Sequence, residues 1–292
     1  MVGVINRVTQ LSKTILEADV MSLVINTNVA SLNAQRSLAS SGTELKTAME
    51  RLSSGKQINS AADDAAGFAI AERMTAQIRG LNMATKNASD GLSMLATIEN
   101  ATNDVTDMLH RMRELAVQAI NDTNGVQDRA YLDGEVQALK AEINRVSSDT
   151  QYNGSNTLDG TLSNSTIQVG TEAGQNISFS VAAVDTATLA IDAIDVTDGA
   201  NAATALSAIS AAIETVAGNR AEYGALQNRL EYTVSNLMNV AEYTTAARSR
   251  IEDADFAAES ARLAKAQVLQ QTGTAMLAQA NASQQLALSL FR

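Results

Sequence analysis

One stripe of apolar and small side chains, spaced alternately three and four residues apart, continues for more than roughly ten helical turns. It consists of Met74, Ile78, Leu81, Thr85, Ala88, Leu92, Leu95, Ile98, Thr102, Val105, Leu109, Met112 and Ala116. The 292 residues include no proline, which would break a helix interior. The sequence therefore predicts a mainly α protein whose long helices pair antiparallel, in the manner of a coiled coil.

The limits of this helix are predicted from short motifs at its two ends. Ser60 and Asp63 have the spacing of a capping box at its start. Asn124 and Gly125 predict a left-handed stop at its end. Aromatic residues make up only 3% of the chain, and much of the apolar content is alanine, which buries little area per residue. We therefore expect long packed helices, not one compact globular core.

Further stripes predict helices over about 128–146, 202–250 and 255–290. Near the start of the chain, three leucines recur at heptad spacing, and these are Leu38, Leu45 and Leu52. Both terminal helices have narrow stripes and few charges elsewhere, so isolated in water they bury too little to offset chain entropy. We expect them to fray in the monomer and to become ordered in an assembly.

The region of about 150–200 has a different pattern. Residues 166–169 and 177–181 alternate with a period of two, and two glycines lie in the segment between them. This predicts a β-hairpin within a small β region.

Charge divides the chain in the same places. Residues 1–60 and 256–292 each sum to +2, whereas residues 61–255 sum to −15, which gives the net charge of −11. This pattern predicts that the two ends pair with each other and pack into an assembly while the middle faces water. The acidic balance argues against nucleic acid or an anionic membrane as partner. No apolar run approaches the roughly 20 residues that span a bilayer.

The sequence offers no catalytic, metal or cofactor site, so we expect no enzyme activity. There is no cysteine, and His110 is the only histidine, which excludes a two-histidine zinc site. Glu252, Asp253 and Asp255 form an acidic cluster in which a metal is conceivable. Carboxylates that stabilise the amides of a helix start explain the cluster better, and Asp63 and Asp64 are interpreted in the same way.

Several strings resemble bacterial flagellin. They are VINTN at 24–28, ERLSSGKQINSAADDAAGFAIA at 50–71, MRELAVQA at 112–119, GALQNRL at 224–230, SRIEDADF at 249–256, QVLQQTGTAMLAQAN at 267–281 and LSLFR at 288–292. The resemblance covers about residues 21–150 and 165–292. It implies a short form of the family with a reduced central region.

The resemblance implies a secreted, extracellular structural subunit that polymerises with itself into the flagellar filament for swimming, after unfolded export by the flagellar type III apparatus. In that family residues 21–60 and 255–292 would form an inner domain lining a channel, and residues 61–254 an outer domain. Implied partners are an export chaperone on residues 256–292, the filament cap and hook-associated proteins. Residues 1–20 precede the family's usual start, and represent either an early start codon or a real extension.

Three sets of residues are candidates for interaction sites. The apolar residues expected to pack between subunits are Leu38, Leu45, Leu52, Leu269, Met276, Leu277, Leu288 and Leu290. By resemblance, Arg111, Leu115 and Glu135 match a patch that vertebrate innate immune receptors bind, although subunit packing explains these residues better. Ser155, Thr157, Thr161, Ser163 and Ser165 are candidates for O-glycosylation, with solvated turn chemistry as the plainer explanation.

Other functions remain open at this point. A minor flagellin or a hook–filament junction protein would share the terminal helices. A helical signalling adaptor belongs to another class, and it predicts a stable soluble dimer without the β region.

Overall fold

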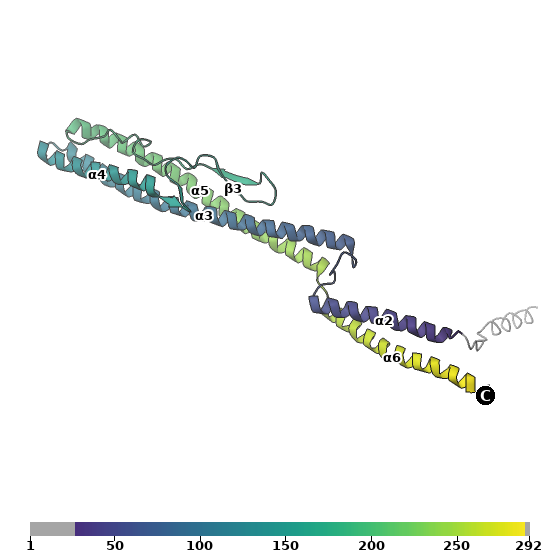
Figure 1. Ribbon diagram of the computed structural model, residues 1–292. Helices are drawn as coiled ribbons and strands as arrows, with labels where there is room; N and C mark the ends of the chain where they lie inside the picture. The colour runs from purple at the N-terminus through teal and green to yellow at the C-terminus, as the bar shows by residue number, and fades with distance from the viewer. Residues whose placement is uncertain (1–26, 290–292) are drawn as a thin grey trace, which may run out of the picture. The chain divides into compact units, whose positions relative to one another are not determined.

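The computed structural model describes residues 27–289 and is mainly α-helical (Figure 1). In chain order the elements are α2 (Val29–Ser54), α3 (Ala65–Ile120), α4 (Val126–Asp149), β1 (Gln151–Tyr152), β2 (Ser155–Asn156), β3 (Ser165–Gln168), β4 (Asn176–Phe179), α5 (Gly199–Glu252) and α6 (Phe256–Ser289). The predicted fold class, long helices with a small β-hairpin region, is confirmed. Residues 1–20 lie outside the described part.

The chain divides into two compact units. Residues 1–69 and 249–292 form one, called here the terminal unit, and residues 70–248 form the other, called the central unit. The boundaries that we expected from sequence lay at 60/61 and 254/255, whereas the units divide at 69/70 and 248/249.

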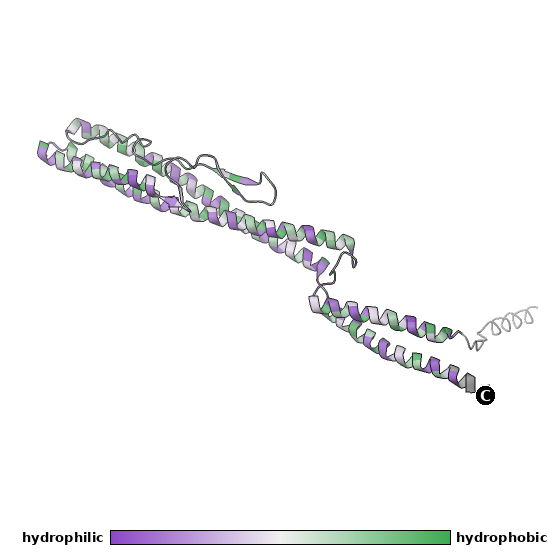
Figure 2. Ribbon diagram, in the orientation of Figure 1, coloured by the Kyte–Doolittle hydropathy of each residue, from purple (hydrophilic) through white to green (hydrophobic). Residues whose placement is uncertain are grey.

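The central unit is built from α3, α4 and α5, with the β-hairpins along them (Figure 1). Its largest fully buried side chains are Leu95, Ile98, Leu109, Met112, Leu115, Ile143, Leu158, Ile191, Ile209, Leu230, Val105 and Val136. The predicted stripe of α3 supplies much of this core, because its three- and four-residue spacing keeps one face against α4 and α5. Figure 2 shows hydrophilic and hydrophobic residues alternating along every helix. Within residues 27–289, no helix combines the length and apolarity that crossing a bilayer would require.

The predicted end signals of α3 were wrong in detail. The Asp63 carboxylate accepts from the backbone N–H of Ser60 at 2.9 Å, but it does so in a turn that precedes the helix. Asp64 caps α3 instead, with its Oδ1 accepting from the N–H groups of Ala66 and Gly67, both at 3.0 Å. At the other end, α3 stops at Ile120 and the expected left-handed glycine is absent. Gly125 has φ −73° and is the N-cap of α4.

The predicted hairpin is present as antiparallel β3 and β4, with Ile167 opposite Ile177. Both isoleucines are buried in the central core. A Cβ at Gly91 of α3 would lie 2.5 Å from the Ile167 Cδ1 atom, so the hairpin packs this closely only because position 91 has no side chain.

A second, smaller hairpin pairs β1 with β2. It turns at Asn153 and Gly154, which have φ 50° and φ 79°. Positive φ at both central residues is the signature of a type I′ turn, for which Asn-Gly is the favoured sequence. The Asn-Gly pair is therefore a sequence signal for this hairpin. The hairpin was not predicted, because the period-two alternation indicated only β3 and β4.

The terminal unit pairs α2 with α6 along their lengths. Asn28 caps α2, with its Oδ1 accepting from the Ser31 N–H at 2.9 Å. The same side chain donates from Nδ2 to the Ala280 carbonyl at 2.9 Å and so joins the two helices. Gly55, in the left-handed conformation with φ 72°, ends α2.

Candidate assembly surfaces

The terminal pair has almost no apolar core of its own. Among the residues described in this unit, the buried apolar side chains are Ala48, Ile58 and Ala266. Large apolar side chains point outward instead, each at least 40% exposed: Val29, Leu32 and Met49 near or on α2, and Phe256, Val268, Leu269 and Met276 on α6. Both helices therefore expose apolar surface to solvent in the single chain.

The predicted packing leucines lie at the edges of this pair. Leu38, Leu45 and Leu52 of α2 and Leu277 of α6 are half-buried, whereas Leu269 and Met276 are exposed. Gly273 of α6 lies opposite Leu38, and a Cβ there would be 3.4 Å from the Leu38 Cδ1 atom. Leu288 falls in the last part of α6, and Leu290 lies outside the described residues. Each stripe thus leaves area that further chains can cover.

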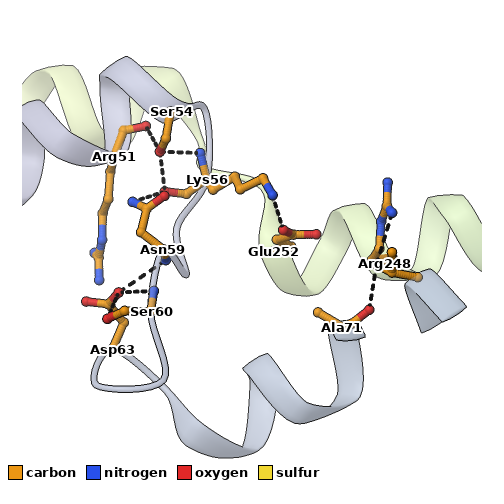
Figure 3. A network of polar contacts seen from close by, with 10 residues as sticks. Arg51, Ser54, Lys56, Asn59, Ser60, Asp63, Ala71, Arg248 and Glu252 are labelled. Atoms are coloured by element: carbon orange, nitrogen blue, oxygen red, sulfur yellow. Dashed lines mark hydrogen bonds and ion pairs between the residues drawn. The ribbon is translucent and has the colours of Figure 1, made fainter. Parts of the chain in front are cut away.

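A polar joint ties residues 54–57 to residues 252–254, at the end of α5 and just before α6 (Figure 3). The Lys56 Nζ lies 2.5 Å from a Glu252 carboxylate oxygen. Backbone bonds reinforce this ion pair, since the Gln57 N–H donates to the Glu252 carbonyl at 2.7 Å and the Ala254 N–H to the Gly55 carbonyl at 2.9 Å. The joint holds the segment that follows α2 beside the short segment that leads from α5 into α6.

Carboxylates near this joint stabilise turns and helix starts. Asp255 Oδ1 accepts from the N–H groups of Ala257 and Ala258 at 2.9 and 3.2 Å, which caps α6. Hydrogen bonds from the Ser60 backbone and hydroxyl lower the pKa of Asp63, which is held as an anion in the turn before α3.

Two residues of the acidic cluster of Glu252, Asp253 and Asp255 therefore have separate structural roles. Glu252 pairs with Lys56, and Asp255 caps α6. Within residues 27–289, no group of three or more potential metal-ligating side chains is present.

One ion pair is buried between α2 and α6. Glu259 is 5% exposed and lies 4.0 Å from the Arg51 Nη1 and 3.1 Å from the Arg262 Nη1. The Arg51 Nε is buried without a hydrogen-bond partner in the described structure. A shift of α2 along α6 would separate Arg51 from Glu259 and leave an uncompensated buried charge. The ion pair therefore favours the one register in which the two residues meet.

The patch expected by resemblance is only partly a surface. The Arg111 Nε donates to the Glu135 carboxylate at 2.8 Å, linking α3 to α4, and Glu114 lies 3.1 Å from the same guanidinium. These hydrogen bonds raise the pKa of Arg111. Leu115 is 1% exposed and belongs to the central core, so its side chain supports the patch from below. His110 is exposed beside it.

The candidate glycosylation positions differ in accessibility. Ser155, Thr161 and Ser163 are exposed, and Ser165 is half-buried in β3. Thr157 is 1% exposed, and its hydroxyl donates to the Thr150 carbonyl at 3.2 Å. A glycan can reach the first three hydroxyls, but not Thr157, without local opening.

Two exposed aromatic residues of α5 were not among the candidates predicted from the sequence. Tyr232 and Tyr243 of α5 are 79% and 75% exposed, and they are spaced eleven residues apart on one side of the helix. The spacing of the sequence could have predicted their exposure, because both tyrosines fall outside the buried stripe of Leu230 and Leu237.

The chain is similar in sequence to known proteins along most of its length. The bacterial flagellin N-terminal helical region matches residues 25–163, and the bacterial flagellin C-terminal helical region matches residues 206–291. A flagellin of Halalkalibacterium halodurans is 44% identical over 272 residues, covering 92% of this chain and 100% of that protein. The flagellar filament 33 kDa core protein of Treponema phagedenis is 39% identical over 286 residues, with 92% and 100% coverage.

A solved structure, of a putative flagellar hook-associated protein from Vibrio parahaemolyticus, has a TM-score of 0.55 with 15% identity. It covers 65% of this chain and 100% of that one, and at this identity it shows the shared fold alone. The two matched regions span more than half of the sequence, and the relatives match along their whole length. The chain belongs to the bacterial flagellin family.

Proposed function

We infer that this chain is a structural subunit that polymerises with copies of itself into the extracellular filament of the bacterial flagellum, which serves swimming. The observation that carries this function is the terminal pair, which exposes large apolar side chains on both helices around a core of alanines. The whole-length relatives include a flagellar filament core protein. The apolar surface is covered when sister chains pack around it.

The geometry of such packing determines the product. The exposed apolar side chains of α2 differ from those of α6, and we propose that neighbouring copies contact each other through these unlike faces. Unlike faces that do not close a ring generate an open helical polymer. The packing residues we propose are the half-buried leucines of α2 together with Leu269, Met276, Leu277, Leu288 and Leu290.

We extend this proposal to the arrangement in the filament. Residues 21–60 and 255–292 form its inner layer around a channel, and residues 61–254 the outer layer. The chain is exported unfolded by the flagellar type III apparatus, and a chaperone covers residues 256–292 beforehand. A filament cap and hook-associated proteins are its other partners. The exposed apolar side chains Phe256, Val268 and Met276 support the need for a chaperone.

Substitution of apolar positions in α6 tests the filament function directly. Leu269→Asp or Leu277→Asp is expected to abolish salt-induced polymerisation seen by electron microscopy, because an unpaired buried carboxylate costs several kcal/mol. The matched control is Gln270→Asp, which places the same charge at an exposed polar position. Filaments of ordinary length from both leucine variants would contradict the proposal.

We propose a structural function without catalysis. The family consists of structural proteins, and the acidic residues of the joint are engaged in a cap and an ion pair. A hook–filament junction protein remains the nearest alternative. It predicts few copies per isolated flagellum, whereas a filament subunit predicts thousands of copies, and quantitative mass spectrometry of flagella separates the two. The β-hairpins weigh against a helical signalling adaptor.

We further propose that a vertebrate innate immune receptor contacts the monomer at the exposed Arg111–Glu135 pair. Leu115 acts by supporting α3 from the core. Purified monomer carrying Arg111→Ala should stimulate receptor-bearing cells less than the unmodified monomer does. Equal stimulation would remove the proposal. If the host glycosylates the chain, Ser155, Thr161 and Ser163 are the accessible acceptors, which peptide mass mapping of native filaments checks.

A further inference from the structure

The outward side of α3 carries a short basic stripe. Arg79, Met83 and Lys86 follow each other at four- and three-residue intervals, and all three are exposed, Met83 by 55%. Neither cation forms an ion pair within residues 27–289. The stripe lies opposite the buried Leu81 and Ala84, because residues at this spacing share one side of a helix.

The outward side of α5 carries the complementary chemistry. The rings of Tyr232 and Tyr243 are more than 70% exposed, and Glu231 and Glu242 precede them in the sequence. Neither of these two glutamates makes an ion pair or side-chain hydrogen bond within the described part of the chain. The four residues form what we call the aromatic–acidic stripe.

The two stripes belong to the same unit and face away from the core that α3 and α5 share. Leu81 and Ala84 of α3 cluster with Leu237 of α5, so both helices direct their buried sides toward each other. The exposed stripes cannot meet within one copy. They can meet between two copies.

We propose that the basic stripe of one copy docks against the aromatic–acidic stripe of a second copy of this chain. This inference rests on the proposed filament function and identifies a contact made by the central unit. A cation above a tyrosine ring is attracted by the ring face, and carboxylates beside the ring add direct charge pairing. Met83 supplies a flexible thioether that packs well against an aromatic ring.

The contact is between unlike faces, so it can repeat from copy to copy without closing. It also explains why two large aromatic residues stay exposed in a chain with few aromatics. The four charged residues that it brings together form no ion pair within residues 27–289 of the single chain.

Charge reversal of each stripe, followed by their combination, tests the contact. Arg79→Glu with Lys86→Glu, and separately Glu231→Lys with Glu242→Lys, should each raise the critical concentration for seeded polymerisation at least about tenfold, because like charges then face each other. Combining all four substitutions in one chain should lower the critical concentration below that of either parent. Arg73→Glu and Glu222→Lys are matched controls at exposed positions outside the stripes, and they should polymerise as the unmodified chain does.

Tyrosine nitration provides a second measurement that does not depend on substitutions. Tyr232 and Tyr243 should react with tetranitromethane in the monomer and be protected in the polymer, with the buried Tyr223 as an unreactive reference. Equal reactivity in monomer and polymer, or reversal variants that polymerise like the controls, would overturn the contact. If the unmodified chain itself forms no polymer, the proposed function fails, which is a separate result.

Discussion

The two units of this chain differ in how much apolar surface they bury within a single copy. In the central unit Leu95, Ile98 and Leu109 are fully buried, and the helices α3, α4 and α5 exclude water from them. In the terminal unit, the described side chains buried between α2 and α6 include only Ala48 and Ala266 among the apolar ones. Ordering a residue costs about 1–2 kcal/mol of backbone entropy, which alanine burial offsets poorly. We therefore expect the central unit to be stable by itself and the terminal unit to depend on neighbouring chains.

Charge follows the same division. Over the whole sequence, the terminal unit contains ten basic and ten acidic residues, whereas the central unit contains eleven basic and twenty-two acidic residues. The net charge of −11 therefore resides in the central unit. A neutral terminal unit can pack closely against copies of itself, while the acidic unit favours solubility.

Removing one half of the terminal pair should abolish assembly altogether. A chain without residues 256–292 should keep the cooperative thermal transition of the central unit in circular dichroism but form no filaments. α2 then lacks the helix against which it packs. Filaments from this truncated chain, or loss of the central transition, would contradict the inferred difference between the two units.

Matched leucine substitutions measure how differently the two units are packed. Leu95→Ala should lower the free energy of unfolding of the monomer by about 2–5 kcal/mol, because it leaves a cavity in a closed core. Leu45→Ala, at a half-buried position of α2, should change it by about 1 kcal/mol or less and raise the critical concentration instead. Denaturant titration of monomers measures both. Equal destabilisation by the two variants would mean that the terminal unit is as well packed as the central one.

Glycine substitutions test how closely the hairpin packs in the central unit. Gly91→Ala should destabilise the monomer by about 1–3 kcal/mol, because its Cβ would overlap the Ile167 side chain. Gly134→Ala in α4 meets nothing within 4 Å and should stabilise the helix by up to about 1 kcal/mol. A neutral result at Gly91 would show that the hairpin can move away freely.

Stability of the central unit should depend only weakly on pH. Hydrogen bonds from Thr197 and Asn201 lower the pKa of Asp195, and bonds from Thr161 lower the pKa of Asp159, both in the central unit. A lowered pKa in the folded state contributes stability above the unfolded value near 3.8, and this is lost as the pH falls through the folded pKa. Thermal melting at pH 5 and pH 3 should therefore show a loss at the lower pH. Asp195→Asn should reduce that loss, and an unchanged loss would exclude this cause.

The sequence was sufficient to predict the long helices, because periodicity over many turns averages out local exceptions. It failed at single positions where tertiary context decides. Ser60 and Asp63 match a capping box, yet Asp64 lies one residue closer to the first helical amides and caps α3. Asn124-Gly125 suggests a left-handed stop, but α4 begins so soon afterwards that Gly125 serves as its N-cap.

Sequence patterns also failed to predict the burial of single residues in the candidate sites. Leu115 belongs to a motif chosen by resemblance, and nothing in the motif says that its side chain enters the core beside Leu109 and Met112. Thr157 lies in a polar segment that looks solvated, although a hydrogen bond to Thr150 draws it inward. Burial of single polar residues depends on contacts between distant segments, which periodicity does not report.

The bond between Asn28 and Ala280 joins positions 252 residues apart in the chain. Contacts of such separation carry a large loop-closure cost, and they can form only once nearly the whole polypeptide exists. In a ribosome-bound chain, α2 therefore remains without its partner helix until α6 has been synthesised. Pairing of α2 with α6 is therefore one of the last contacts that a newly made chain can form.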